Sequence, residues 1–130
     1  TGRLVFISAP TPDPVSTIRR LVGMCPEERR IPALHTISMA LRGIISQRLL
    51  PTLDGRGLAM VPEIAAVNDS VRQAIWTNKI EQIPNLMLGA PGSILLDASL
   101  RNLILRGQID FEHASQIDRD PEGLRRSVAI

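Results

Sequence analysis

The chain has 130 residues, of which 44% are hydrophobic and only 2% aromatic, and its formal net charge is +2. This length suffices for one domain with a hydrophobic core and is too short for two such domains. Because aromatic residues are scarce, aliphatic side chains must fill that core. The scarcity of aromatic rings argues against a single-strand nucleic-acid binder, which stacks bases on several rings. Cys25 is the single cysteine, which excludes an internal disulfide and favours a reducing, intracellular compartment.

The start of the sequence indicates a segment of a longer protein. It opens at Thr1-Gly2 without a methionine, directly before the apolar residues 4–7, which predict a buried strand. No apolar run approaches the ~18 residues that a membrane span requires, and no signal-peptide pattern is present. Prolines at positions 10, 12 and 14 predict a loop after the strand.

Helix-start signals and residue spacing predict the elements in the first half of the chain. Asp13 is suited to cap a helix that ends near Gly23, and Pro26 begins the next one. Helical spacing runs from Leu34 to Ile44, and a strand-like pattern follows from position 45 to Pro51. Residues 54–57 (Asp-Gly-Arg-Gly) predict a hairpin turn, with a return strand over 58–67.

The second half is predicted to be helical. Asn68 or Asp69 caps a helix over 70–77, and a short helix follows over 80–88. A longer helix over 93–106 ends at Gly107 and should bury Leu96, Leu100, Leu103 and Leu105. Asp110 and Asp120 each begin one more short helix.

In their order, these segments resemble the C-terminal part of the type II/type IV secretion ATPases, especially the PilT-type twitching-motility retraction ATPases. Residues 1–6 (Thr-Gly-Arg-Leu-Val-Phe) resemble the histidine-box strand of the family, Thr-Gly-His-Leu-Val-Phe. The strongest match comprises residues 41–51, 54–55 and 61–64. Residues 70–75 stand where retraction ATPases have Ala-Ile-Arg-Asn-Leu-Ile-Arg-Glu, and residues 97–100 and 120–122 match the tail helices.

The resemblance implies an α/β, predominantly helical fold. This would be the C-terminal part of a RecA-like P-loop ATPase core with a β-hairpin and a C-terminal helical bundle. Residues 1–67 would belong to the core with its hairpin, and residues 68–130 would form the helical subdomain. ATP and Mg would bind the intact parent, but not this segment alone, because the phosphate-binding Gly-x-x-x-x-Gly-Lys-[Ser/Thr] loop and the Walker B strand are absent from it. We expect no catalytic residue and no metal ligand here.

The same resemblance implies a part of a hexameric ring that moves a pilus or drives secretion. The ring would be cytoplasmic, peripheral at the bacterial inner membrane and in contact with pilus or secretion platform proteins, without nucleic acid. Arg3 and Pro10 replace the two box histidines, so Arg3 and Thr11 are predicted to sense phosphate in a degenerate box. The predicted subunit or motor contacts are Arg42, Gln47, Arg48, Glu63, Arg72 and Trp76.

Three alternatives remain open from the sequence. One is an extension or secretion ATPase of the same superfamily. Another is a non-catalytic, degenerate paralogue or regulatory module that binds a motor ring, since both histidines are missing. The third is a basic helical nucleic-acid binder, which the scattered charge disfavours. Glu63 is either an interface acid or a hydrogen-bonded strand residue, and His35, His113 and Cys25 are predicted to be structural.

Overall fold

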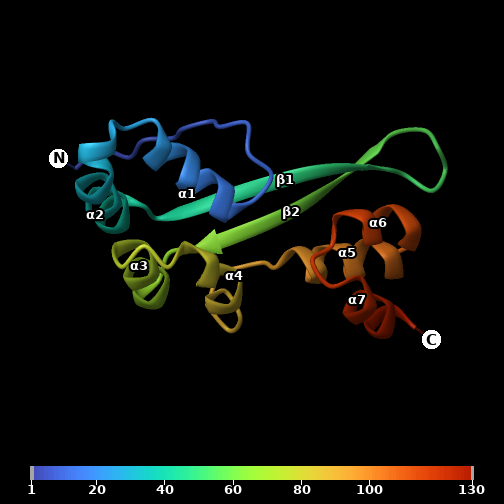
Figure 1. Ribbon diagram of the computed structural model, residues 1–130. Coiled ribbons are helices and arrows are strands. Elements are labelled where there is room, and N and C mark those ends of the chain that lie inside the picture. Colours follow the sequence, from blue (N-terminus) through green and yellow to red (C-terminus); the bar gives the residue numbers. More distant parts are fainter. Residues whose placement is uncertain (1, 130) are drawn as a thin grey trace.

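The computed structural model describes residues 2–129. A two-stranded antiparallel sheet crosses the molecule, and short helices pack along it (Figure 1). Before the sheet come α1 (Pro14–Gly23), the 3-10 turn η1 (Glu27–Arg29) and α2 (Arg30–Ala40). The strands are β1 (Gly43–Pro51) and β2 (Leu58–Ala66). After them follow α3 (Asp69–Trp76), η2 (Ile80–Gln82), α4 (Ile83–Leu86), α5 (Leu96–Leu105), α6 (Phe111–Ile117) and α7 (Pro121–Val128).

The hairpin is continuous from Gly43, which pairs with Ala66, to Pro51, which pairs with Leu58. Residues 52–57 form its loop, in which the Thr52 hydroxyl donates to Asp54 Oδ1 over 2.6 Å. That bond and the Arg56 backbone N–H hold the pKa of Asp54 below its usual value. Gly55 has a φ of +68°, which glycine adopts without steric cost. The predicted turn and return strand are therefore confirmed.

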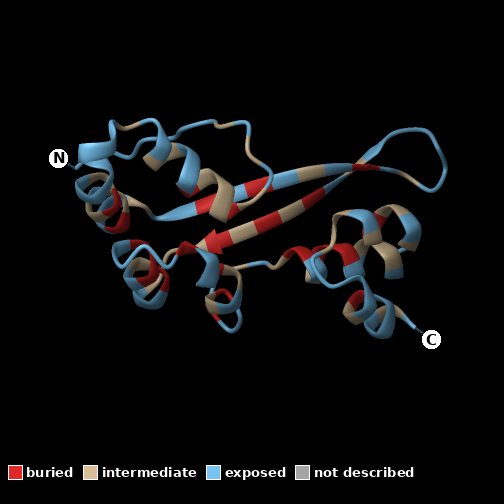
Figure 2. Ribbon diagram, in the orientation of Figure 1, coloured by how far each residue is buried: buried red, intermediate tan, exposed pale blue. Residues whose placement is uncertain are grey.

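Two apolar clusters lie along one face of this hairpin. The first joins its open end to helices α1 to α4, with Ile18, Ile75 and Ile83 at its centre. The second joins Leu50 and Val61, near the loop, to helices α5 to α7. Buried and more exposed positions alternate along both strands (Figure 2), as expected for a sheet with one covered face. The hairpin thus connects two groups of helices, each of which packs around its own apolar cluster.

Three local predictions were wrong. Residues 4–7 form no strand, and their side chains are 70–88% exposed, because no described strand lies beside them to complete a ladder. Helix α2 ends at Ala40, so Ile44 lies inward on β1 instead of on the helix. Leu105 is 59% exposed, since α5 turns it away from the second cluster. None of the helices within residues 2–129 is long and apolar enough to cross a bilayer.

Candidate functional site: a polar cluster on the hairpin

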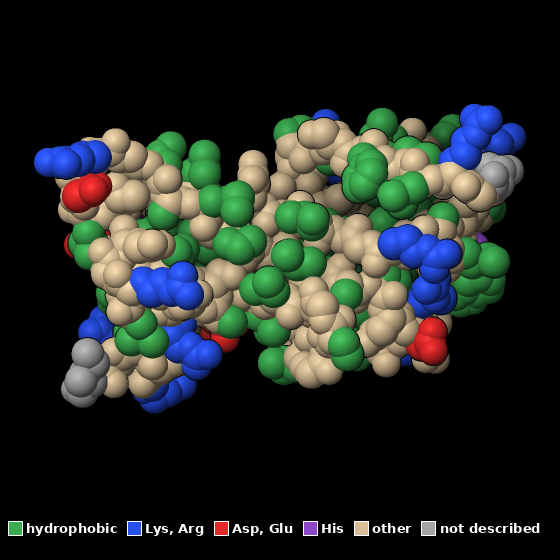
Figure 3. Space-filling model, turned by 180° about the vertical axis from the view of Figure 1, so that it is seen from behind, with side chains coloured by type: hydrophobic (Ala, Val, Ile, Leu, Met, Phe, Trp, Pro, Cys, Tyr) green, Lys and Arg blue, Asp and Glu red, His purple; other side chains and the backbone are tan. Residues whose placement is uncertain are grey.

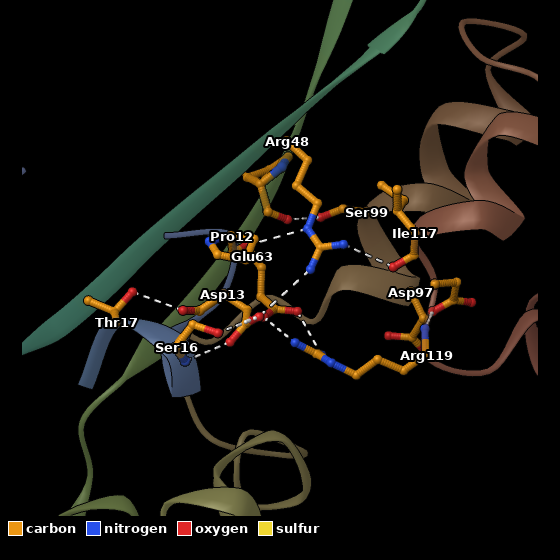
Figure 4. Close-up of polar contacts among 12 residues, drawn as sticks. Pro12, Asp13, Ser16, Thr17, Arg48, Glu63, Asp97, Ser99, Ile117 and Arg119 are labelled. Carbon is orange, nitrogen blue, oxygen red and sulfur yellow. Dashed lines mark hydrogen bonds and ion pairs between the residues drawn. The ribbon is translucent and has the colours of Figure 1, made fainter. Parts of the chain in front are cut away.

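Glu63 is a carboxylate inside the covered face of the hairpin, and its residue is 2% exposed. The strand alternation that turns Val61 and Ala65 inward turns Glu63 inward as well. Its oxygens accept two parallel hydrogen bonds from Arg119, which follows α6: Nη1 lies 2.9 Å from Oε2, and Nη2 lies 2.7 Å from Oε1 (Figure 4). A buried carboxylate needs such a partner, because an unpaired charge in the interior is costly. The pairing raises the pKa of Arg119.

Arg48 extends the same cluster from β1. Its Nη1 donates to the carbonyl of Ile117 over 3.1 Å, and its Nε donates to the carbonyl of Pro12 over 3.4 Å. Its Nη2 lies 4.0 Å from Asp13 Oδ2. One guanidinium therefore touches the loop before α1 and the C-terminal end of α6, which lie more than a hundred residues apart in the sequence. We call Asp13, Arg48, Glu63 and Arg119 the polar cluster.

Asp13 connects this cluster to the start of α1. Its Oδ1 accepts from the backbone N–H of Ser16 over 2.8 Å, so it caps the helix as predicted. Thr17 donates from its hydroxyl to the Asp13 carbonyl over 2.8 Å, and its Oγ1 lies 2.7 Å from that of Thr11. Thr11 is thus held by α1, whereas the Arg3 side chain is exposed and makes no hydrogen bond or ion pair within residues 2–129.

Two of the predicted contact residues bind their own chain. Arg72 Nη1 donates to the carbonyls of Ser38, over 2.5 Å, and Met39, over 3.1 Å, at the C-terminal end of α2. A cation there complements the helix dipole and donates hydrogen bonds to carbonyls that the helix leaves unpaired. Trp76 is 47% exposed and stacks on His35, with ring centroids 3.8 Å apart. Both residues therefore join α2 to α3.

Arg42 and Gln47 differ from the other predicted contact residues. Both are exposed, and neither side chain has a hydrogen-bond or ion-pair partner within the described part of the chain. Gln47 stands opposite Pro62 in the register, on the hairpin face that points away from the helices. These two remain available to another surface.

We compared the chain with known proteins. No protein-family model matches it. It is 34% identical over 126 residues to a "twitching motility protein" of Neisseria gonorrhoeae, which covers 95% of this chain and 34% of that protein. Against the "type IV pilus retractation ATPase PilT" of Pseudomonas aeruginosa it is 31% identical over 124 residues, with 94% and 36% covered. A crystal structure of the pilus retraction motor PilT with bound ADP superposes with a TM-score of 0.74 at 33% identity, covering 89% of this chain and 32% of that one. Over most of its length, the chain is similar to the PilT-type secretion ATPases.

The match has a defined extent. The chain spans about a third of the length of the curated relatives it matches, and its helices and hairpin correspond to the C-terminal part of the PilT-type structures. The Legionella pneumophila ATPase DotB shares the fold, with a TM-score of 0.68 at 23% identity. The expected resemblance to this family and the expected fold class are thus confirmed.

The predicted phosphate-sensing residues and the polar cluster lie in different surroundings. The chain includes no phosphate-binding glycine loop, and Arg3 lies on an exposed segment that no described contact orients. The polar cluster holds its charged groups in fixed contacts with one another and with backbone carbonyls.

Sequence reasoning missed Arg119. The available signal was Glu63 itself, because a carboxylate among apolar strand residues requires a cation. The sequence could not indicate which arginine would supply it, since the partner lies 56 positions further along. Within the described residues Glu63 is a hydrogen-bonded strand residue, and its role as an interface acid stays a prediction.

Proposed function

We propose that this chain is the C-terminal part of a hexameric motor ATPase that couples ATP hydrolysis to pilus retraction or to secretion. The observation that supports it is the continuous similarity to twitching-motility proteins over 95% of the chain. The intact motor would bind ATP and Mg through the part that precedes this segment. It would act in the cytoplasm, peripheral to the inner membrane, against pilus or secretion platform proteins.

In this motor, residues 1–67 would complete the ATPase core, and residues 68–130 would form the C-terminal helical subdomain. The chain's own role would be mechanical. Residues 3–11 resemble the phosphate-sensing box, and Arg48 contacts the two residues directly after them, the carbonyl of Pro12 and the carboxylate of Asp13. Arg48 then connects this loop to the end of α6, and Arg119 connects the α6–α7 junction to β2. A displacement of the loop would therefore reach the C-terminal helices through side chains that are already in contact.

The test uses the intact motor. Arg48→Gln keeps a polar side chain but loses the charge and the forked geometry that reaches both carbonyls. We expect phosphate release to continue while the movement obtained per ATP hydrolysed falls, measured as pilus retraction in the same strain. Gln47→Ala, the neighbouring residue on the opposite hairpin face, is the matched control. If the movement per ATP hydrolysed is equal in the two variants, the proposed role of Arg48 is refuted. If the intact parent hydrolyses no ATP, the proposal that it is a motor ATPase is refuted.

A degenerate, non-catalytic paralogue is the second candidate. It is supported by one observation: Arg3 and Pro10 stand where the family has histidines. In that case the parent would join or regulate a ring without hydrolysing ATP. The double substitution Arg3→His and Pro10→His would then be expected to raise ATP turnover, whereas an active parent would gain little from it. Phosphate release by the two purified proteins separates these outcomes.

A further inference from the structure

A hollow opens on the surface where α1, α2 and the turn after α3 meet. It has a volume of about 440 Å³, and its lining includes Arg19, Val22, Arg30, Asn78, Ile80 and Glu81. These residues come from the C-terminal half of α1, the first position of α2, and the turn that leads from α3 into η2. The volume lies within the range of small-molecule sites, which is about 300–1,000 Å³. The hollow shares no residue with the polar cluster.

The part of the chain around the hollow carries an excess of positive charge. Residues 14–42 and 69–82, which contain α1, α2, α3 and η2, include seven Lys or Arg and four Asp or Glu. Their net charge therefore exceeds the +2 of the whole chain. Seen from behind, Lys and Arg side chains lie mostly toward the two ends of the molecule, and hydrophobic side chains cover much of its middle (Figure 3). A local excess of one charge attracts ligands of the opposite sign.

The charged groups of the hollow offer more hydrogen-bond donors than acceptors. Arg19 forms an ion pair with Glu81, which connects α1 to η2. Arg30 is exposed, and its guanidinium has neither a hydrogen bond nor an ion pair within residues 2–129. A guanidinium carries five N–H donors in a planar fork that fits a carboxylate or a phosphate. One positive charge of the hollow is thus left without a counter-charge.

Asn78 adds a donor that its turn does not require. It follows the C-cap of α3 with a φ of +56°, and the N–H groups of Asn78 and Lys79 donate to the carbonyls of Ile75 and Ala74. Glycine is the usual residue at such a position, because it has no Cβ to strain the left-handed backbone. The side-chain amide of Asn78 has no hydrogen-bond partner in the described part of the chain. The asparagine therefore supplies the hollow with a free amide.

We propose that this hollow binds a small organic anion, whose carboxylate or phosphate group is held by Arg30 and Asn78. The apolar part of the ligand lies against Val22, which is half-buried, and Ile80, which is 5% exposed. The bound anion joins the start of α2 to the turn after α3. The site lies outside the nucleotide chemistry of the proposed motor, and the inference does not rest on the motor function.

Titration of the isotope-labelled 130-residue chain, followed by NMR at constant ionic strength, tests this site. Propyl phosphate and butyrate are the probes, and the tighter of the two identifies the anionic group. The side-chain signals of Arg30 and Asn78 should shift together and saturate with at least one probe. If neither probe saturates these signals by about 20 mM, where a ligand of this size should fill a site that offers these contacts, the proposal is overturned.

Two substitutions test the donors. Arg30→Gln removes the fork and should weaken binding about ten-fold, whereas Arg20→Gln removes an exposed arginine outside the hollow and should change it less than about two-fold. Asn78→Gly keeps the left-handed turn and deletes only the amide, so it should weaken binding about three-fold while the chain stays folded. If Arg30→Gln and Arg20→Gln have equal effects, the probes respond to net charge alone and the site is refuted.

Glu81→Gln should act in the opposite direction. It releases Arg19 from its ion pair, so a second guanidinium can reach the anion and binding should tighten about three-fold. Glu112→Gln, at an exposed acid of α6, changes the net charge equally and is the control. Equal affinities of these two variants contradict the site. The backbone amide spectrum of each variant, recorded before the titration, shows that it is folded, and none of these readouts depends on ATP turnover.

Discussion

Removal of Arg119 is the sharpest test of the polar cluster. Arg119→Ala deletes both donors that Glu63 accepts, at 2.9 and 2.7 Å, and leaves a carboxylate whose residue is 2% exposed. Breaking a buried ion pair on one side costs about 3–5 kcal/mol. Because the Arg119 side chain is itself 42% exposed, water can reach part of the vacated site. We therefore expect a loss at or just below the lower end of this range, about 2–3 kcal/mol in the free energy of unfolding.

Urea unfolding of the 130-residue chain, followed by circular dichroism, measures this loss. Arg101→Ala, at an exposed arginine of α5, is the control and should change stability by less than about 0.5 kcal/mol. The double variant Glu63→Leu with Arg119→Met replaces both partners by apolar groups and should recover most of the loss, because no buried charge is left unpaired. If Arg119→Ala behaves like Arg101→Ala, the carboxylate is solvated and the reasoning fails.

Two further predictions concern the C-terminal helices. Backbone and side-chain hydrogen bonds from His113 lower the pKa of Asp110 below its ordinary 3.8, so the stabilisation by Asp110 is present above that value and is lost as the pH falls through the folded-state pKa. Asp110→Asn should flatten the fall of urea stability in this acid range, and an equally steep fall in the variant would contradict the assignment. In α5, Leu100→Ala should cost about 2–5 kcal/mol, because Leu100 is 0% exposed. Leu105→Ala, at 59% exposure, should cost far less in the same urea experiment, and similar losses would show that Leu105 is packed after all.

The helix starts and the hairpin could be predicted because the residues that form them are close together in the sequence. Asp13, Asn68, Asp110 and Asp120 each cap a helix by accepting from the backbone N–H three residues later. That interaction spans one turn of chain, so the sequence contains both partners side by side. The hairpin was predictable for the same reason, because its turn residues and its two apolar strands are neighbours.

The junction between α2 and β1 shows where local reasoning fails. Leu41 and Ile44 continue the helical spacing of Leu34 and Ile37, so the pattern fits both a longer helix and an inward-facing strand residue. Arg72 of α3 donates hydrogen bonds to the carbonyls of Ser38 and Met39 at the end of α2. This helix end is therefore stabilised by a residue more than thirty positions away, which local spacing does not reveal.

The sequence by itself determined the family resemblance, the helix caps, the hairpin and the absence of the phosphate-binding loop from these 130 residues, because each depends on residues close together or on their order. Only the tertiary structure decided which charged groups meet. Of the predicted contact residues, Arg48, Glu63 and Arg72 bind within the chain, while Arg42 and Gln47 remain exposed. The physical reason is that strand alternation can turn a charge inward, but the partner that neutralises it comes from whichever segment the packing of the helices brings there.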